Sequence, residues 1–163
     1  MKRFHGLLTK LILAVTALIV LVSLTACSGG KSGKTPATQD IANKLMQTCT
    51  YDELIELKDD VLYNQYDKLD KSIVKEISVY VCSSGAAVDE ICVIRVNNES
   101  DIAAAKQAIE SRLKDQHDKF VDYVPAEIPK LDKAVTATNG TYIMMTAASD
   151  SEKATDAFNK MFE

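Results

Sequence analysis

Glu90 is the acidic residue whose position most suggests chemistry. It follows a turn that contains Gly85 and begins a segment rich in β-branched residues, where a carboxylate can be partly buried near Arg95 or Arg112. A carboxylate in such a place can act as an acid or base or can bind a ligand, but structural ion pairs perturb buried carboxylates as well. We therefore interpret Glu90 first as a structural or ligand-binding group. The adjacent Asp89 fits turn chemistry.

The histidine and cysteine pattern gives no support for a metal or cofactor site. His117 has no second ligand four residues away, and the spacing of Cys49, Cys82 and Cys92 does not match the paired ligands of zinc sites. Cys82 and Cys92 could lie opposite each other on one face of a hairpin centred near Ala87. Because such a hairpin is already a short loop, a disulfide across it would remove little chain entropy and add little stability. We therefore expect reduced, buried thiols. We predict no catalytic residue, no metal and no cofactor.

Four tyrosines could line a ligand groove, namely Tyr66, Tyr80, Tyr123 and Tyr142. Aromatic-lined clefts bind ligands or partners, yet large amphipathic side chains also sit half-buried on sheet faces and helix ends as a matter of routine. The candidate binding residues are therefore Glu90, Arg112, Tyr123 and Tyr142.

The N-terminal segment Leu24-Thr25-Ala26-Cys27 predicts covalent lipid attachment. Basic residues come first, and Leu11 to Ala26 then contains no charge, which is the build of an export signal. The four residues resemble a bacterial lipobox, which implies cleavage before Cys27 and transfer of a diacylglyceryl group to its thiol, with fatty acyl chains such as palmitate. The alternative is a transmembrane anchor, but the uncharged run is shorter than the roughly 20 residues that a spanning helix needs.

This reading divides the chain into a signal peptide at 1–26, a flexible tether at 27–37 and a single domain at 38–163. The sequence has 19 basic and 23 acidic residues, and three of the basic ones precede Leu11, so the domain is more acidic than the whole chain. Binding to nucleic acid would require a basic patch, which the interspersed charges do not provide. We expect an extracytoplasmic protein that is held at the cell membrane by lipid and does not bind nucleic acid.

Hydrophobic periodicity predicts an α+β fold. We expect helices over 39–48, 101–120 and 151–162, a helix-rich segment over 51–66, and strands over 73–82, 90–96, 134–138 and 141–148. The strands form two hairpins of an antiparallel sheet, covered by a long central helix, a C-terminal helix and N-terminal helices. Asn139-Gly140 predicts a tight type I′ turn.

The long central helix has an inner stripe in which Gln116 is the only polar residue. The stripe comprises Ile102, Ala105, Ile109, Leu113, Gln116 and Phe120. Its opposite side alternates charges at four-residue spacing, which is typical of a solvated face.

Several short motifs together resemble an uncharacterised family of Gram-positive lipoproteins, known as a domain of unknown function. These are Ser84-Gly85-Ala86-Ala87-Val88-Asp89-Glu90-Ile91, Arg112, Tyr123-Val124-Pro125 and Asn139-Gly140-Thr141-Tyr142. The similarity covers about Asp59 to Phe162. It implies an anchored extracytoplasmic domain, and it brings no activity, substrate or cofactor.

Two classes of function remain open. The first is a non-catalytic binding or scaffolding module at the cell surface that recognises a cell-envelope protein or ligand. The second is a cell-envelope enzyme that uses acidic residues such as Glu90. A deep pocket of convergent polar groups would favour the enzyme, and a flat apolar or tyrosine-rich surface would favour the binder.

Overall fold

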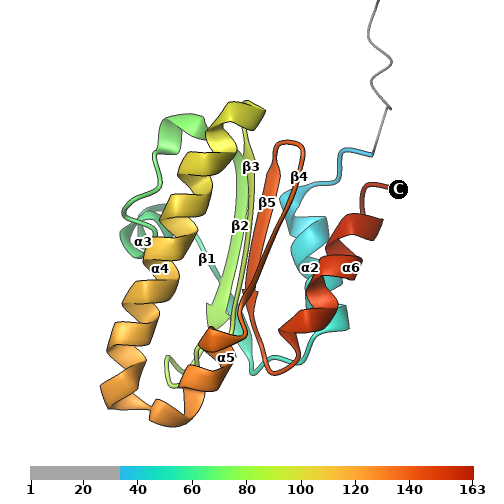
Figure 1. Cartoon of the computed structure of the whole chain (residues 1–163). Helices are drawn as coiled ribbons and strands as arrows, with labels where there is room; N and C mark the ends of the chain where they lie inside the picture. Colours follow the sequence, from blue (N-terminus) through green and yellow to red (C-terminus); the bar gives the residue numbers. More distant parts are fainter. Residues whose placement is uncertain (1–33) are drawn as a thin grey trace, which may run out of the picture. The chain divides into compact units, whose positions relative to one another are not determined.

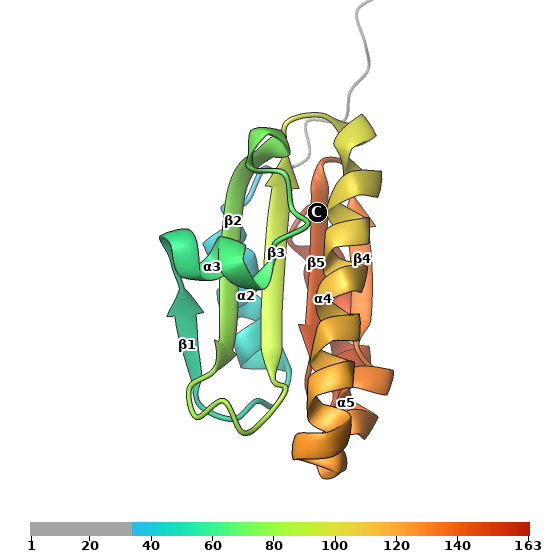
Figure 2. The same cartoon turned by 90° about the vertical axis from the view of Figure 1, so that its left-hand side faces the viewer.

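A computed structural model describes residues 34–163, and its centre is a five-stranded antiparallel sheet in the order β1-β2-β3-β5-β4. The strands are β1 (Leu54–Leu57), β2 (Val74–Cys82), β3 (Glu90–Val96), β4 (Val135–Asn139) and β5 (Tyr142–Ala147). The helices are α2 (Thr38–Thr48), α3 (Asp59–Gln65), α4 (Ile102–Tyr123), α5 (Ile128–Asp132) and α6 (Ala154–Lys160). Figure 2 shows the strand order face-on. The predicted α+β class and both predicted hairpins, β2-β3 and β4-β5, are confirmed.

Helices cover both faces of the sheet, which gives three layers. The long helix α4 and the short helix α3 lie on one face, and α2 and α6 lie on the other (Figure 1). The central strand β3 serves both layers because successive side chains point to opposite faces. Ile91 and Val93 pack toward α2 and α6, whereas Cys92 and Ile94 pack toward α3 and α4. A fully buried aliphatic side chain of this kind contributes about 1.5–3 kcal/mol.

The segment 51–66, which the sequence predicts to be helix-rich, contains a strand. Leu54–Leu57 forms β1 and pairs with β2, and the helix α3 follows it. The four residues Leu54-Ile55-Glu56-Leu57 do not alternate between apolar and polar side chains, which is the pattern by which a half-buried strand is recognised. Pairing with the long strand β2 therefore decides the conformation of this segment, which is a tertiary effect that local propensity does not report.

The β4-β5 turn is present but differs from the predicted type I′ geometry. Asn139 pairs with Tyr142, so the two loop residues are Gly140 and Thr141. Gly140 has φ +53, and Asn139 is not among the positive-φ residues of the described chain. A glycine with positive φ at the first loop position is the pattern of a type II′ turn, which suits a two-residue hairpin equally well.

Replacing Gly140 with valine is expected to destabilise the domain by about 1–3 kcal/mol, because a β-branched residue at positive φ is strained. Thermal unfolding followed by circular dichroism measures the change. Thr141→Val is the matched control, because Thr141 does not have a positive φ. A melting temperature for Gly140→Val equal to that of the control would show that the chain does not turn at this glycine.

Cys49, Cys82 and Cys92 are buried and are not paired in a disulfide within residues 34–163. The expected placement of Cys82 opposite Cys92 is wrong, because Cys92 pairs with Val79. Cys82 lies three positions after Val79 on the same strand, and this odd offset puts the Cys82 side chain on the other face of the sheet. The hairpin therefore holds these two thiols apart in any redox state.

Candidate binding pocket beside a buried carboxylate

The Glu90 carboxylate lies inside the protein against the guanidinium of Arg112. Its side chain is 0% exposed, and Arg112 Nη2 lies 2.7 Å from Oε2 while Nε lies 3.2 Å from each carboxylate oxygen. Glu90 is the first residue of β3, and its side chain points toward α4. Arg112 lies on α4 and contacts it there. Such a forked, charge-assisted contact is among the stronger polar interactions of proteins.

Tyr66 and Gln116 complete the hydrogen bonding of this carboxylate. The Tyr66 hydroxyl donates to Oε1 and the Gln116 amide donates to Oε2. Tyr66 follows α3 directly, and Gln116 lies one turn beyond Arg112 on α4. Hydrogen-bond donors from two parts of the chain therefore surround both carboxylate oxygens of Glu90. A carboxylate that already accepts several hydrogen bonds is poorly placed to take a proton from a substrate as a general base.

Burial changes the acidity of the groups around Glu90. It raises the pKa of the Tyr66 hydroxyl well above its usual range, and the nearby Cys92 and Glu90 add to this increase. Burial raises the pKa of the Cys92 thiol to about 12, so this thiol is a packed core group and not a nucleophile. Burial also opposes the charge of Arg112, but the attraction of Glu90 prevails and the pKa of the guanidinium is raised.

A second buried ion pair fixes the loop between β2 and β3. Lys130 on α5 places Nζ 2.7 Å from Oδ2 of Asp89 and 3.0 Å from Oε2 of Glu127. The backbone N–H of Val88 also donates to Glu127 at 3.1 Å. Burial raises the pKa of the Asp89 carboxyl, and Lys130 opposes that increase. Asp89, predicted to be only a turn residue, thus joins the loop to α5.

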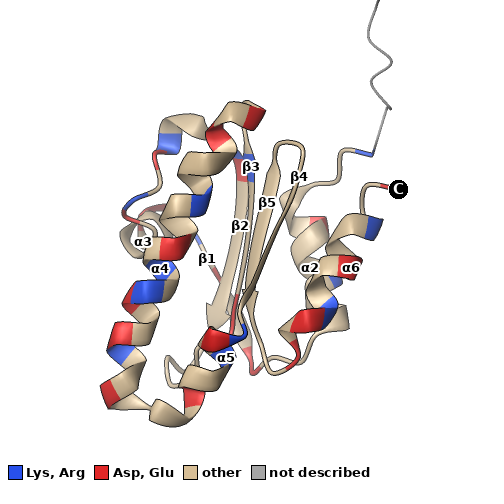
Figure 3. Ribbon diagram, viewed as in Figure 1, with Lys and Arg blue, Asp and Glu red and all other residues tan. Residues whose placement is uncertain are grey.

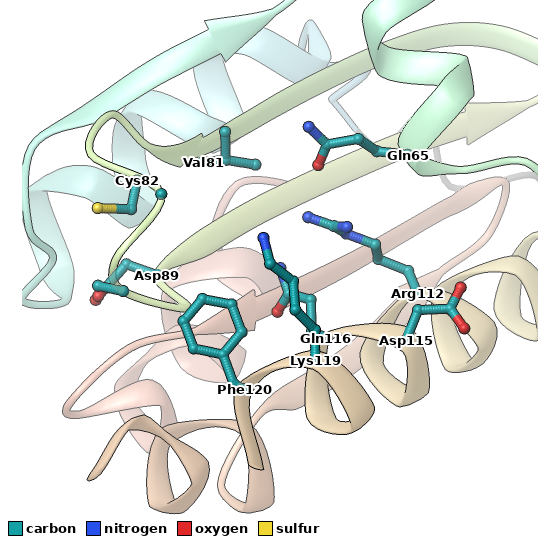
Figure 4. A pocket seen from close by; sticks show the side chains of 11 residues that line it. Gln65, Val81, Cys82, Asp89, Arg112, Asp115, Gln116, Lys119 and Phe120 are labelled. Atoms are coloured by element: carbon teal, nitrogen blue, oxygen red, sulfur yellow. The ribbon is translucent and has the colours of Figure 1, made fainter. Parts of the chain in front are cut away.

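A pocket of about 420 Å³ opens between this loop and α4. Figure 4 shows the side chains of Arg112, Lys119 and Phe120 around it. Its lining comes from α3, from the β2-β3 hairpin and from α4: Gln65, Val81, Cys82, Gly85, Ala87, Asp89, Arg112, Asp115, Gln116, Lys119 and Phe120. Arg112 and Gln116 therefore contact Glu90 and also line the pocket, so the buried carboxylate holds two of the lining side chains in place.

The structure brings together two of the four candidate binding residues. Glu90 and Arg112 are in contact, whereas Tyr123 is 61% exposed at the end of α4 and packs edge-on against Phe120 at 6.0 Å between ring centroids. Tyr142 is buried on the opposite face of the sheet, where its hydroxyl donates to the carbonyl of Pro36 at 2.9 Å. Tyr123 and Tyr142 therefore lie outside the Glu90 cluster.

Arg95, the alternative partner for Glu90, turns to the other side of the sheet. Arg95 lies five positions after Glu90 on the same strand, and this odd offset points their side chains to opposite faces. The guanidinium carbon of Arg95 lies 5.2 Å from the centre of the Tyr142 ring. A cation over an aromatic face is a favourable contact of roughly 0.5–2 kcal/mol.

Sequence reasoning did not assign Tyr66, Gln116 or Lys119 to this site. Gln116 did give a signal, because it is the only polar residue in the inner stripe of α4 and a buried amide needs a partner. Tyr66 gave a weaker one, as one of four tyrosines. Lys119 is part of a helix surface on which charges of both signs alternate (Figure 3), so nothing in the pattern marked it.

In the part of the chain that the structure describes, His117 stands apart from the Glu90 cluster. His117 is 44% exposed on α4, with Asp132 at 4.0 Å. Within residues 34–163, no three His, Cys, Asp or Glu side chains are arranged to hold a metal ion. In the same residues, no helix is long and apolar enough to cross a membrane. The predicted signal peptide at 1–26, the lipidation site Cys27 and most of the tether at 27–37 lie outside the described residues.

The fold and the site define an α+β domain with an antiparallel sheet covered on both faces and a pocket of mixed polar and apolar lining beside a buried ion pair. The chain belongs to the family DUF4358, a domain of unknown function, whose model matches residues 50–148. The matched region begins just before β1 and ends just after β5, so it includes the whole sheet, Glu90 and Arg112. Neither a curated protein nor a solved structure matches the chain.

Proposed function

We propose that this protein is a lipid-anchored extracytoplasmic binding module whose ligand occupies the pocket between the β2-β3 loop and α4. The anchoring part rests on the charge pattern of residues 1–26 and on Cys27 at the end of the lipobox-like segment. Two acyl chains on one cysteine give stable attachment, where a single chain gives only marginal binding.

One observation supports binding over catalysis, namely the saturation of the Glu90 carboxylate by Arg112, Tyr66 and Gln116. An enzyme that used Glu90 as acid or base would need a free oxygen at the surface of the pocket. Glu90 is fully buried and serves instead to position the side chains above it. The envelope-enzyme alternative is therefore the weaker of the two.

The ligand that best fits this pocket is a small molecule with a carboxylate or another anionic group. The hydrogen bonds between Arg112 and Glu90 use Nε and Nη2, which leaves Nη1 for a ligand. Lys119 adds a second cation to the lining, and Gln65 adds a neutral amide. The lining also contains two carboxylates, Asp89, which is paired with Lys130, and Asp115. A guanidinium held in a fixed orientation is well suited to recognising a planar carboxylate.

Thermal unfolding of the full-length protein in detergent, with acetate, succinate, citrate or inorganic phosphate added, tests this assignment. A ligand at about 100 times its Kd adds roughly 2.7 kcal/mol to stability. We expect at least one of these anions to raise the melting temperature of the wild type, and we expect Lys119→Glu to remove most of that increase.

Lys106→Glu is the matched control, because Lys106 is an exposed cation of α4 that does not line the pocket. It should keep the response of the wild type. An equal response in Lys119→Glu and Lys106→Glu, or no response to any of the anions, would contradict an anion-binding pocket.

A further inference from the structure

The two edges of the sheet differ in their protection against pairing with another strand. At one edge, β1 has only four residues, and Glu56 within it forms an ion pair with Lys58 at 3.0 Å. At the other edge, β4 reads Val-Thr-Ala-Thr-Asn, without a charge or a proline, and its register with β5 has no bulge. Figure 3 shows β4 without a charged residue. Charges, prolines and bulges are among the usual protections against edge pairing, and the five residues of β4 include none of these.

The outer side of β4 presents backbone groups at two residues. Along an antiparallel strand, residues alternate between directing their N–H and C=O groups to one neighbour and to the other side. The pair Asn139 and Tyr142 closes a two-residue hairpin, and this closing pair is a hydrogen-bonded one. By alternation, the outward-facing groups belong to Thr136 and Thr138, whose side chains are also exposed.

We propose that a second copy of this chain pairs with the β4 edge in antiparallel orientation, with the two-fold axis at Ala137. In this register Thr136 lies opposite Thr138 of the second copy, and the reverse holds by symmetry. All outward-facing groups of both strands then find partners, and the two sheets become continuous. Threonine pairs across antiparallel strands are also mutually favourable. This inference does not depend on the pocket.

The charges that flank β4 complement each other in this register and favour a second copy over an unrelated strand. Lys133 would lie opposite Thr141 of the second copy, next to Gly140. The Glu99 carboxylate lies beside that turn, with Oε1 3.6 Å from the position that a Cβ atom on Gly140 would take. Lys133 and Glu99 are both exposed, and neither is in an ion pair within residues 34–163. Two-fold symmetry would create two Lys133–Glu99 pairs between the copies.

Disulfide cross-linking of the full-length protein under mild oxidation tests the register. Ala137→Cys would place two thiols at a directly opposed, non-hydrogen-bonded pair, where Cα atoms are about 4.5 Å apart and a disulfide can form. Thr136→Cys would place them diagonally at about 7–8 Å, which is too far for easy bridging. The native cysteines of the described chain are buried and should not compete.

We expect the Ala137→Cys protein to form linked dimers about tenfold faster than the Thr136→Cys protein, because only the first pair is within bridging distance. If the molecules were linked only by random collision, the Thr136→Cys protein would form dimers faster, because position 136 is the more exposed of the two. Equal rates, or faster linking of Thr136→Cys, would overturn the proposal.

A charge swap in the Ala137→Cys background tests the choice of partner. Lys133→Glu alone and Glu99→Lys alone each create two like-charge pairs between copies, which should slow cross-linking several-fold. The double variant restores both pairs with reversed signs and should recover the original rate. Circular dichroism confirms that each variant is folded. Cross-linking that the single changes leave unaltered, or that the double variant fails to recover, would contradict pairing with a second copy.

Discussion

Replacing Arg112 with alanine is expected to lower the free energy of unfolding by about 3–5 kcal/mol, because it leaves a buried carboxylate without its counter-charge. Glu90 is 0% exposed and the Arg112 side chain is only 15% exposed, so solvent would do little to replace the lost contact. Unfolding by urea, followed by circular dichroism, measures the effect.

The double variant Arg112→Ala with Glu90→Gln separates the loss of charge pairing from the loss of packing. Glutamine keeps the shape of Glu90 and removes its charge, so the double variant should be more stable than Arg112→Ala alone. Measuring Glu90→Gln alone as well completes the double-mutant cycle and gives the coupling between the two sites. A loss of less than about 1 kcal/mol in the free energy of unfolding for Arg112→Ala is the range of exposed ion pairs. Such a result would mean that the Glu90 carboxylate is in contact with water and not buried.

Replacing Cys27 with alanine is expected to abolish incorporation of labelled lipid and to leave the signal peptide uncleaved by the lipoprotein pathway. The thiol is the proposed site of acylation, and two acyl chains are needed for stable attachment. Metabolic labelling with a radioactive fatty acid, followed by electrophoresis, measures the incorporation. Cys49→Ala is the control, because Cys49 is a buried thiol of the folded domain and should not affect labelling. Labelled lipid on the Cys27→Ala protein would exclude the lipobox interpretation.

The elements with strong periodicity could be predicted from the sequence, and those determined by tertiary pairing could not. Strand β3 was expected over the same residues at which it is found, because five of its seven residues are β-branched or otherwise apolar and turns bound it. The sequence does not predict strand β1, because its four residues become a strand only through pairing with β2. The β4-β5 turn was placed one residue early, since Asn139-Gly140 and Gly140-Thr141 are both acceptable loops for a two-residue hairpin.

The candidate site could be predicted only where one element determined it. The position of Glu90 at the start of a strand and the polar residue in the inner stripe of α4 were both visible in the sequence. The choice of Arg112 over Arg95 follows from strand alternation, once β3 is known to be covered on both faces. The contact with Tyr66 depends on how α3 packs against the sheet, and the pocket depends on three elements together. No pattern within a single segment encodes that arrangement.

The binding pocket is tested most directly by mapping where an anion acts on the protein. Backbone amide NMR signals of the full-length protein in detergent can be followed during titration with citrate and with inorganic phosphate. A ligand in the pocket should shift the amides of Gly85, Ala87 and Lys119, with smaller changes elsewhere, and Lys119→Glu should weaken the titration. Signals that move instead around the separate cavity lined by Met46, Cys49, Thr50, Tyr51, Asp52 and Leu54, or that do not move at all, would contradict binding between the β2-β3 loop and α4.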